Sequence, residues 1–165
     1  MIRVGAAAVL ALICGAADVA AQANYGSAVA ATGDVVFVAQ PANSAGPGKV
    51  YAYRAGADGA WTQTARLTSP DAELGDAFGV AIAARGNLLL AGQPTANEQR
   101  GVVHVFERRG EAWQHVGRIS PSDAAAGDSI GLAIALGDDV AIIGGAKSAY
   151  IFRRSGGSWT QEARL

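Results

Sequence analysis

The fold is decided by residues 78–119, which read FGVAIAARGNLLLAGQPTANEQRGVVHVFERRGEAWQHVGRI. This stretch holds four short apolar pieces separated by turn residues, and the same arrangement occurs three times in the chain. Each copy opens with a large apolar residue followed by Gly and ends with a Trp six residues before a Leu or Ile. The opening glycines, Gly26, Gly79 and Gly131, are 53 and 52 residues apart. A period of this length is typical of propellers, solenoids and repeat arrays.

The four pieces of each copy have the lengths and patterns of β-strands. In the second copy the first piece, 80–84, is followed by a Gly-Asn step that suits a tight hairpin turn with positive φ. The next piece, 88–91, is a continuous apolar run, which indicates a strand covered on both faces. The third piece is 103–106, and the fourth begins at Trp113 and alternates, which predicts a half-buried outermost strand. The equivalent pieces are 27–31, 35–39, 50–53 and 61–67 in the first copy, and 132–136, 140–143, 149–152 and 159–165 in the third.

Details of these pieces lead to two further expectations. The turn after the first piece contains Gly33-Asp34, Gly86-Asn87 or Gly137-Asp138, so we expect the same tight hairpin in all three copies. Strict alternation in the fourth piece predicts that its Trp, the polar residue two positions on, the next Ala or Gly and the final Leu or Ile share one face. A helical reading of the Ala-rich pieces fails, because each is about five residues long, whereas helices usually need about ten or more.

We therefore predict an all-β fold of three four-stranded antiparallel blades of a β-propeller, with repeats at about 25–77, 78–129 and 130–165. Propellers ordinarily close with about four to eight blades, so three blades predict an incomplete arc rather than a closed ring. We expect a fragment of a larger propeller protein. Ring closure then requires missing blades, a partner chain or a homo-oligomer.

Residues 1–23 have the pattern of a secretory signal peptide, which places the remaining residues, 24–165, in the periplasm or outside the cell. Arg3 precedes an apolar run at 4–17, and Ala-Gln-Ala at 21–23 is a small-x-small cleavage site. The apolar run is too short to span a bilayer comfortably, so no membrane span is expected after its removal. The only cysteine, Cys14, lies in this segment, so disulfides are not expected to stabilise the fold. The full chain has 13 basic and 14 acidic residues, a balance that gives no argument for nucleic-acid binding.

Two polar links, 68–77 and 120–129, share a Ser-Pro step, acidic residues and a Gly-Asp step. Their carboxylates are candidates for a divalent cation site or an acid/base pair. The candidate residues are Asp71, Glu73, Asp76, Asp123 and Asp128. Asp after Ser-Pro or Gly commonly bonds to turn backbone, so we favour a structural role and predict no metal or cofactor.

The remaining candidate residues also have structural interpretations. His104 occupies the position of Tyr51 and Tyr150, and His115 that of two glutamines, which favours packing over metal ligation. Equal placement of the three tryptophans indicates packing between blades, and the nearby arginines are expected to be solvated or to pair with link carboxylates. These residues are Trp61, Trp113 and Trp159, and Arg66, Arg118 and Arg164. With no nucleophile elbow and no phosphate loop, we predict no catalytic residues and no enzyme activity.

The second copy resembles the FG-GAP repeats of integrin-α-type β-propellers, and more closely their bacterial secreted branch. The resemblance rests on Phe78-Gly79, the 92–94 step Gly-Gln-Pro, the 103–106 strand Val-His-Val-Phe and the Trp strand, and it extends over 25–165. In integrin-type repeats, calcium sits in an Asp-rich loop between the first and second strands. Here that loop is a two-residue turn, too short to supply six to eight oxygen ligands, so the calcium function is not expected.

The expected function is an exported, non-enzymatic propeller-type binding or scaffold module, with a protein or glycan as ligand. The loop before the third strand differs between copies and is the first place to look for binding. It spans 42–49, 95–101 and 147–148 in the three copies. Two alternatives stay open: an accessory propeller domain of a secreted enzyme whose catalytic part is absent, and a self-assembling structural arc.

Overall fold

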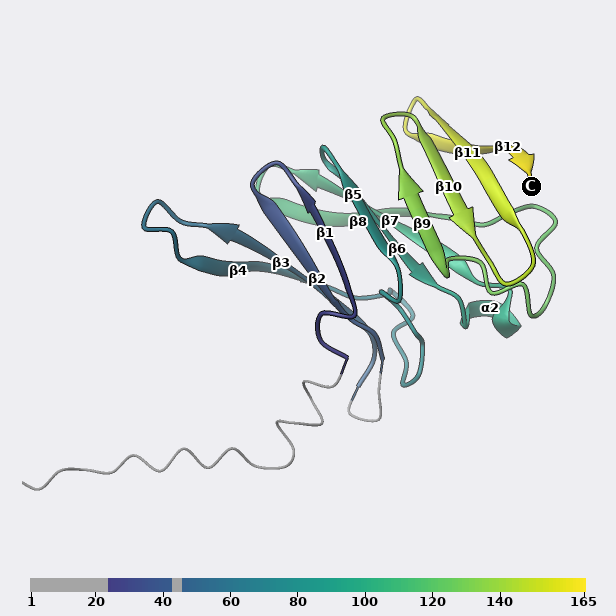
Figure 1. The fold of residues 1–165 in the computed structure, drawn as a ribbon, viewed down its shortest axis with the longest axis horizontal. Helices are drawn as coiled ribbons and strands as arrows, with labels where there is room; N and C mark the ends of the chain where they lie inside the picture. The colour runs from purple at the N-terminus through teal and green to yellow at the C-terminus, as the bar shows by residue number, and fades with distance from the viewer. Residues whose placement is uncertain (1–23, 43–45) are drawn as a thin grey trace, which may run out of the picture.

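The computed structural model describes residues 24–42 and 46–165, so the predicted signal peptide lies outside the described residues. Figure 1 shows three sheets standing side by side. Sheet 1 contains β1 (Ala28–Thr32), β2 (Val35–Gln40), β3 (Lys49–Ala55) and β4 (Trp61–Leu67). Sheet 2 contains β5 (Ile82–Arg85), β6 (Leu88–Gln93), β7 (Val102–Arg109) and β8 (Ala112–Ile119). Sheet 3 contains β9 (Ala133–Leu136), β10 (Val140–Gly144), β11 (Ala149–Ser155) and β12 (Ser158–Arg164).

Each sheet is an antiparallel meander whose strands neighbour one another in chain order. Strand β1 contacts β5, and β5 contacts β9, so the first strand of each sheet lies on the inner side of the arc. Strands β4, β8 and β12 form the opposite edges of their sheets. None of the three sheets closes on itself. The prediction of an all-β fold with three four-stranded blades in an open arc is therefore confirmed.

The short element α2 (Ala96–Gln99) lies between β6 and β7 and is not a regular helix. Asn97, Glu98 and Gln99 all have positive φ, with values of 53°, 59° and 60°. L-residues with a Cβ rarely adopt this conformation. Within the described residues, no helix is long and apolar enough to cross a membrane.

The hairpin after the first strand follows the prediction in two copies and departs from it in the third. Gly33 and Gly86 have φ values of 55° and 56° in two-residue turns, the backbone that glycine adopts readily. In sheet 3 the connection has three residues, 137–139, and Gly137 does not have positive φ. The prediction of the same tight turn was wrong here. No residue is added here, because Gly131 and Val140 are as far apart in sequence as Gly26 and Val35. Gly137 instead stands at the position of Thr32, and its amide donates to the Val140 carbonyl at 2.7 Å.

Each outer strand carries a β-bulge at the same place, which changes the predicted faces. The residues left out of the strand pairing are Thr64, Val116 and Glu162. In β4, Trp61 and Gln63 pair with β3 residues that face the open end of the arc. Ala65 and Leu67, beyond the bulge, pair with β3 residues that face sheet 2. The prediction that these four positions share one face was wrong, because the inserted residue shifts the alternation by one.

The core consists of two apolar layers, one on each side of sheet 2. Between sheets 1 and 2 lie Val35, Phe37, Ala39, Val50, Ala52 and Leu67, packed against Phe78, Ile82, Leu89, Ala91 and Phe106. Between sheets 2 and 3 lie Leu88, Leu90, Val103, Val105 and Ile119, packed against Ile130, Ala141, Ile143, Tyr150 and Phe152. Because both faces of sheet 2 are covered, every residue of β6 is buried. This explains the unbroken apolar run in its sequence.

The tryptophans test the predicted role in packing between blades. The ring of Trp113 on sheet 2 meets the ring of Phe37 on sheet 1 edge-on, with 4.9 Å between centroids. Trp159 of sheet 3 packs against the second apolar layer. Trp61 is 56% exposed, because sheet 1 is the first sheet of the arc and none of the described residues lies in front of it. The prediction is therefore confirmed for the two tryptophans that have a preceding sheet.

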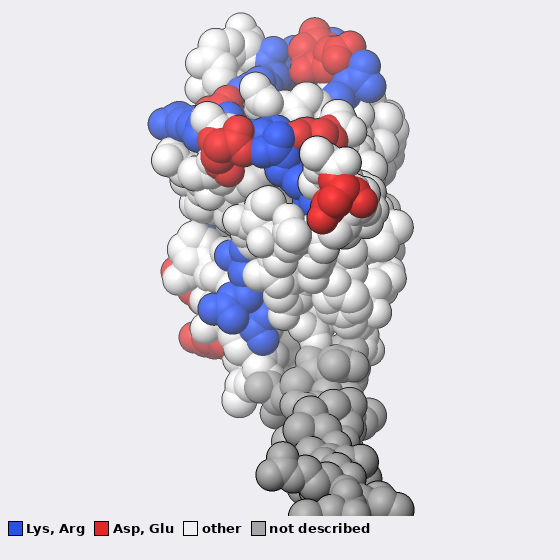
Figure 2. Space-filling view, turned by 90° about the vertical axis from the view of Figure 1, so that its left-hand side faces the viewer, with Lys and Arg blue, Asp and Glu red and all other residues white. Residues whose placement is uncertain are grey.

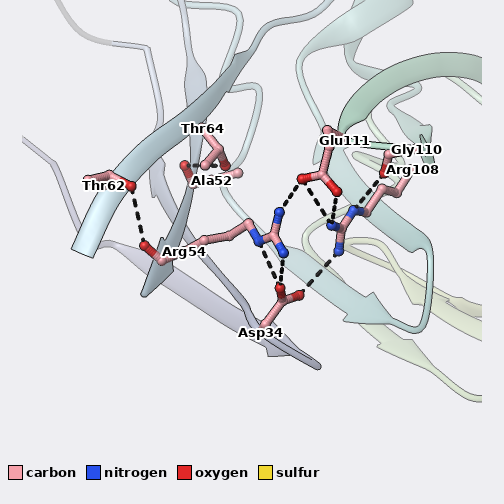
Figure 3. A network of polar contacts seen from close by, with 8 residues as sticks. All are labelled: Asp34, Ala52, Arg54, Thr62, Thr64, Arg108, Gly110 and Glu111. Carbon is pink, nitrogen blue, oxygen red and sulfur yellow. Dashed lines mark hydrogen bonds and ion pairs between the residues drawn. The ribbon is translucent and has the colours of Figure 1, made fainter. Parts of the chain in front are cut away.

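A charged network joins the outer rims of sheets 1 and 2 (Figure 3). Arg54 of sheet 1 forms ion pairs with Asp34 of its own sheet and with Glu111 of sheet 2. Arg108 of sheet 2 reaches back, with its Nη1 3.2 Å from Asp34 Oδ1. These side chains are partly exposed, so each pair contributes little to stability. Their alternating charges favour one alignment of the two sheets.

The close approach of sheets 2 and 3 depends on glycines. A Cβ built on Gly92 of β6 would lie 2.0 Å from the carbonyl oxygen of Gly131, far inside contact distance. Gly117 of β8 provides a matched control, because nothing lies within 4 Å of its added Cβ. Both positions are in strands, and neither has positive φ.

We predict that Gly92→Ala lowers the free energy of unfolding by about 2 kcal/mol, since the added methyl forces two backbones apart. Gly117→Ala should change it by no more than about 0.5 kcal/mol. Urea denaturation followed by far-UV circular dichroism measures both values. Equal effects of the two substitutions would show that the close approach does not limit stability.

Candidate functional site

A polar pocket of about 330 Å³ lies where the link before β5 meets the loop between β6 and β7. The link contributes Asp71 and residues 73–76, and the loop contributes Thr95, Ala96 and Asn97. The sheet itself contributes Gln93, Val102, His104 and Arg118. The pocket therefore lies at the end of sheet 2 that carries the links and the loops before the third strands. This is the end where the sequence placed the variable loops.

A hydrogen-bonded chain of three side chains runs from the pocket into the sheet. His104 is fully buried, with its Nε2 2.7 Å from Gln93 Oε1 and its Nδ1 3.1 Å from His115 Nε2. Because an amide oxygen only accepts, His104 Nε2 carries the proton, and Nδ1 accepts from His115 Nε2. Both nitrogens of His104 are therefore engaged while the ring is neutral.

The surroundings favour the neutral form of both histidines. Burial lowers the pKa of His104 to about 4, and the neighbouring His115 and Arg118 add to the decrease. Burial also lowers the pKa of His115, with Arg118 contributing. Protonation of His104 would in addition place a second N–H opposite the N–H of His115. We conclude that the pair is neutral at pH 7.

Arg118 and Asp71 form an ion pair beside the pocket. Sheet 3 repeats the arrangement: Arg164 Nη1 lies 2.8 Å from Asp123 Oδ2, and Gln161 Nε2 donates to Asp123 Oδ1 at 3.2 Å. The link carboxylates therefore pair with the outer strand of the sheet that follows, as the sequence suggested. For Arg66, the equivalent residue of sheet 1, no ion pair exists among the described residues.

The two aspartates of the Gly-Asp steps hold turns together. Asp76 is 6% exposed, and its Oδ1 accepts from the backbone amides of Gly48 at 3.0 Å and Phe78 at 3.1 Å. Asp128 is equally buried, and its Oδ2 accepts from the Ala125 amide at 2.7 Å, a bond that lowers its pKa. These contacts agree with the structural role favoured from the sequence.

The structure does not bring the five acidic candidates together. Asp71, Glu73 and Asp76 belong to the pocket of sheet 2, whereas Asp123 and Asp128 lie beside sheet 3. Across residues 24–42 and 46–165, no group of three or more His, Cys, Asp or Glu side chains is arranged to hold a metal ion.

The comparison with family models matches residues 61–106 to the FG-GAP repeat. The chain contains an FG-GAP repeat. The match begins with β4 of sheet 1, crosses the first link and ends in β7 of sheet 2. It therefore takes in all the pocket residues except Arg118. A search of curated proteins finds no match to the chain.

The alignment of the three copies pairs His104 and His115 with their correct equivalents in sheets 1 and 3. It did not predict that the two histidines contact each other. Phe106, the last residue of the FG-GAP segment, pairs with His115 between β7 and β8. His115 lies just before the bulge at Val116. Strict alternation in β8 gave no reason to expect a bulge there. The sequence does contain one indication of the contact: the copy that has His in place of Tyr at the first position also has His in place of Gln at the second.

In sheet 3, the tyrosine at the position of His104 has a hydroxyl group without a hydrogen-bond partner among the described residues. In sheet 1, the Tyr51 hydroxyl donates to Gln40 Oε1 at 3.0 Å. In sheet 3, the Tyr150 hydroxyl is buried and has no hydrogen-bond partner within the described residues. Gly145 follows the strand at the place where sheet 1 has Gln40, so sheet 3 lacks the amide that would serve it.

We predict that stability falls as the pH is lowered from about 6.5 to 4. The unfolded chain binds protons on its histidines below about pH 6.5, whereas native His104 stays neutral until about pH 4. Lowering the pH over this interval therefore stabilises the unfolded state relative to the native state. The decrease from this residue is up to about 3 kcal/mol. Urea unfolding at pH 7.5 and 4.5 measures it. The double variant His104→Tyr/His115→Gln, which copies the other sheets, should lose most of the decrease, and an unchanged decrease would contradict the assignment.

We also predict that Tyr150→Phe changes the free energy of unfolding by less than about 0.5 kcal/mol, or raises it, because it removes a buried hydroxyl that lacks a partner. Tyr51→Phe should cost about 1 kcal/mol, since it loses the bond to Gln40. Thermal and urea unfolding of the two variants give the comparison. A larger cost for Tyr150→Phe than for Tyr51→Phe would refute this interpretation.

Proposed function

We propose that the chain is an exported, non-enzymatic binding module that holds a polar ligand, a protein segment or a glycan, at the loop end of sheet 2. The observation that supports this proposal is the polar pocket between the link and the loop containing Thr95 and Asn97. Loops held on a rigid scaffold are the usual place for binding sites in repeat folds. The FG-GAP segment provides both walls of the pocket.

The pocket lining suits a ligand with hydroxyl or amide groups. Carboxylates of Glu73 and Asp71 accept hydrogen bonds, and Arg118 and Asn97 supply donors. The neutral His104 beneath them adds no charge. Because both ring nitrogens of His104 already take part in hydrogen bonds, the pocket favours binding over general-base chemistry.

The loop wall is fixed before any ligand arrives. Thr95 Oγ1 donates to the Asp76 carbonyl at 2.6 Å, which ties the loop to the link. At the other end of the loop, the carbonyls of Gln99 and Arg100 accept from the amides of Ser129 and Ile130, at 2.7 and 2.9 Å. Between these anchors lie the residues with positive φ, a conformation that is often retained at binding sites. A preformed wall lowers the entropy lost on binding.

A self-assembling arc is a second candidate role, favoured by a separate observation. Large apolar side chains are exposed at both ends of the arc, including Trp61 at 56% and Leu165 at 69%. This role concerns the faces of the terminal sheets and does not compete with the pocket for residues.

The binding role is tested by screening the chain against immobilised glycans and a peptide library, followed by titration of the strongest ligand. We predict that Glu73→Ala and Asn97→Gly each weaken binding at least tenfold, a loss of about 1.4 kcal/mol. Glycine retains the positive φ of residue 97, so the second change removes the side chain alone. Asn87→Ala, in an exposed turn between β5 and β6, is the matched control and should leave affinity unchanged. A ligand whose affinity is indifferent to both pocket variants would refute the assignment of the site.

A further inference from the structure

The two histidines of the chain face each other between β7 and β8 of sheet 2. His104 Nδ1 lies 3.1 Å from His115 Nε2. The sequence contains no other histidine, and the equivalent positions of the other two copies hold tyrosine and glutamine. Of the three sheets, sheet 2 is therefore the one in which two imidazole nitrogens meet.

The separation of these two nitrogens suits a single metal ion bound by both. Zinc binds histidine nitrogen at about 2.0–2.1 Å, so two such nitrogens lie about 2.9 Å apart at a right angle and about 3.3 Å apart at the tetrahedral angle. The observed 3.1 Å lies between these values. The two strands therefore need not separate to hold an ion, and a rotation of the rings directs both lone pairs toward it.

The second nitrogen of His104 has the partner that is usual at a metal ligand. His104 Nε2 donates to Gln93 Oε1 at 2.7 Å, which orients the ring and leaves Nδ1 as the nitrogen without a proton. Metal-bound histidines almost always donate their other N–H to an oxygen in this way. Burial lowers the pKa of His104 to about 4, so the ring binds a metal at pH 7 without first losing a proton.

His115 connects the pair to solvent. It lies on the outer strand β8 and is exposed, although the ring of Phe106 packs on it edge-on, with 5.3 Å between centroids. Its Nε2 proton now forms the hydrogen bond to His104. When a metal binds, that proton leaves Nε2 and solvent supplies one to Nδ1, so the ring stays neutral and the number of bound protons is unchanged. One hydrogen bond is replaced by two metal–nitrogen bonds.

We propose that His104 Nδ1 and His115 Nε2 chelate a divalent transition-metal ion, of the class of Zn²⁺, Ni²⁺ and Cu²⁺, with water as the remaining ligands. The inference is independent of the proposed ligand pocket, which His115 does not line. Imidazole suits these metals, whereas Mg²⁺ and Ca²⁺ prefer oxygen ligands. Once one nitrogen has bound, the other is held at a high effective concentration, so the pair binds more tightly than either ring alone.

The charges around the pair do not oppose a cation. Arg118 and Asp71, the charged residues that act on the histidines, form an ion pair with each other. Figure 2, which views the molecule from the side of sheet 1, shows acidic side chains lying among basic ones near the top. Asp34, for example, pairs with two arginines of the rim network. Carboxylates held in this way compete poorly for a metal ion.

Thermal unfolding of the full chain, produced without a histidine tag, tests the proposal at pH 7.5. We expect Tm to rise with Cu²⁺, Ni²⁺ or Zn²⁺, most with Cu²⁺, and to stay unchanged with Mg²⁺ or EDTA. Titration calorimetry should give one ion per chain. His104→Tyr and His115→Gln, which introduce the residues of the other sheets, should each weaken binding at least tenfold. Circular dichroism checks that each variant is folded.

Nitrogen-15 NMR of the histidine rings with Zn²⁺ identifies the ligand atoms. His104 Nδ1 and His115 Nε2 should shift, while His104 Nε2 keeps its proton. Glu73→Gln, in the neighbouring pocket, should leave the metal affinity unchanged. The proposal is overturned if neither Tm nor the ring signals respond, or if the affinity survives both histidine variants. A loss of affinity in Glu73→Gln would also overturn it, because the ion would then bind to the carboxylates of the pocket.

Discussion

The whole structure depends on the burial of sheet faces against one another. A four-stranded sheet with two apolar faces is unstable in water by itself, and sheet 2 satisfies the requirement by lying between sheets 1 and 3. At about 25 cal/mol per Å² of apolar surface removed from water, these layers supply the main stabilising term. Glycines at the crossing points, such as Gly92 against Gly131, allow the backbones to approach closely enough for side chains to interdigitate.

The sequence was sufficient to predict the strands and their order within each sheet. Each of these depends on short-range patterns, namely continuous apolar runs, alternation and glycine turns, repeated three times. The bulges at Thr64, Val116 and Glu162 could not be predicted, because they arise from the way the outer strand twists against its neighbour, and the sequence alternates through them. The third hairpin departed from the other two because its Gly-Asp step lies one position earlier, so that Asp138 and Asp139 occupy the positions of Gly33 and Asp34.

The candidate site was predictable in part for the same reason. Because the chain contains three copies, each position can be compared with its equivalents in the other two. This comparison correctly identified Asp76 and Asp128 as turn residues and aligned His104 with the tyrosines of sheets 1 and 3. The pocket was not predictable, because it requires the link and the loop of sheet 2 to meet in space. Its loop wall contains non-glycine residues with positive φ, and neither Glu98 nor Gln99 signals that conformation in a sequence.

The packing between sheets and the polar pocket involve different parts of each sheet. Sheet faces point along the arc toward the next sheet, whereas the links and the loops before the third strands lie at the strand ends. The three sheets follow one another in the same orientation, so their equivalent links and loops lie on the same side of the arc (Figure 1). A substitution on a sheet face therefore acts on the packing between sheets, whereas a substitution in a link or loop acts on the pocket.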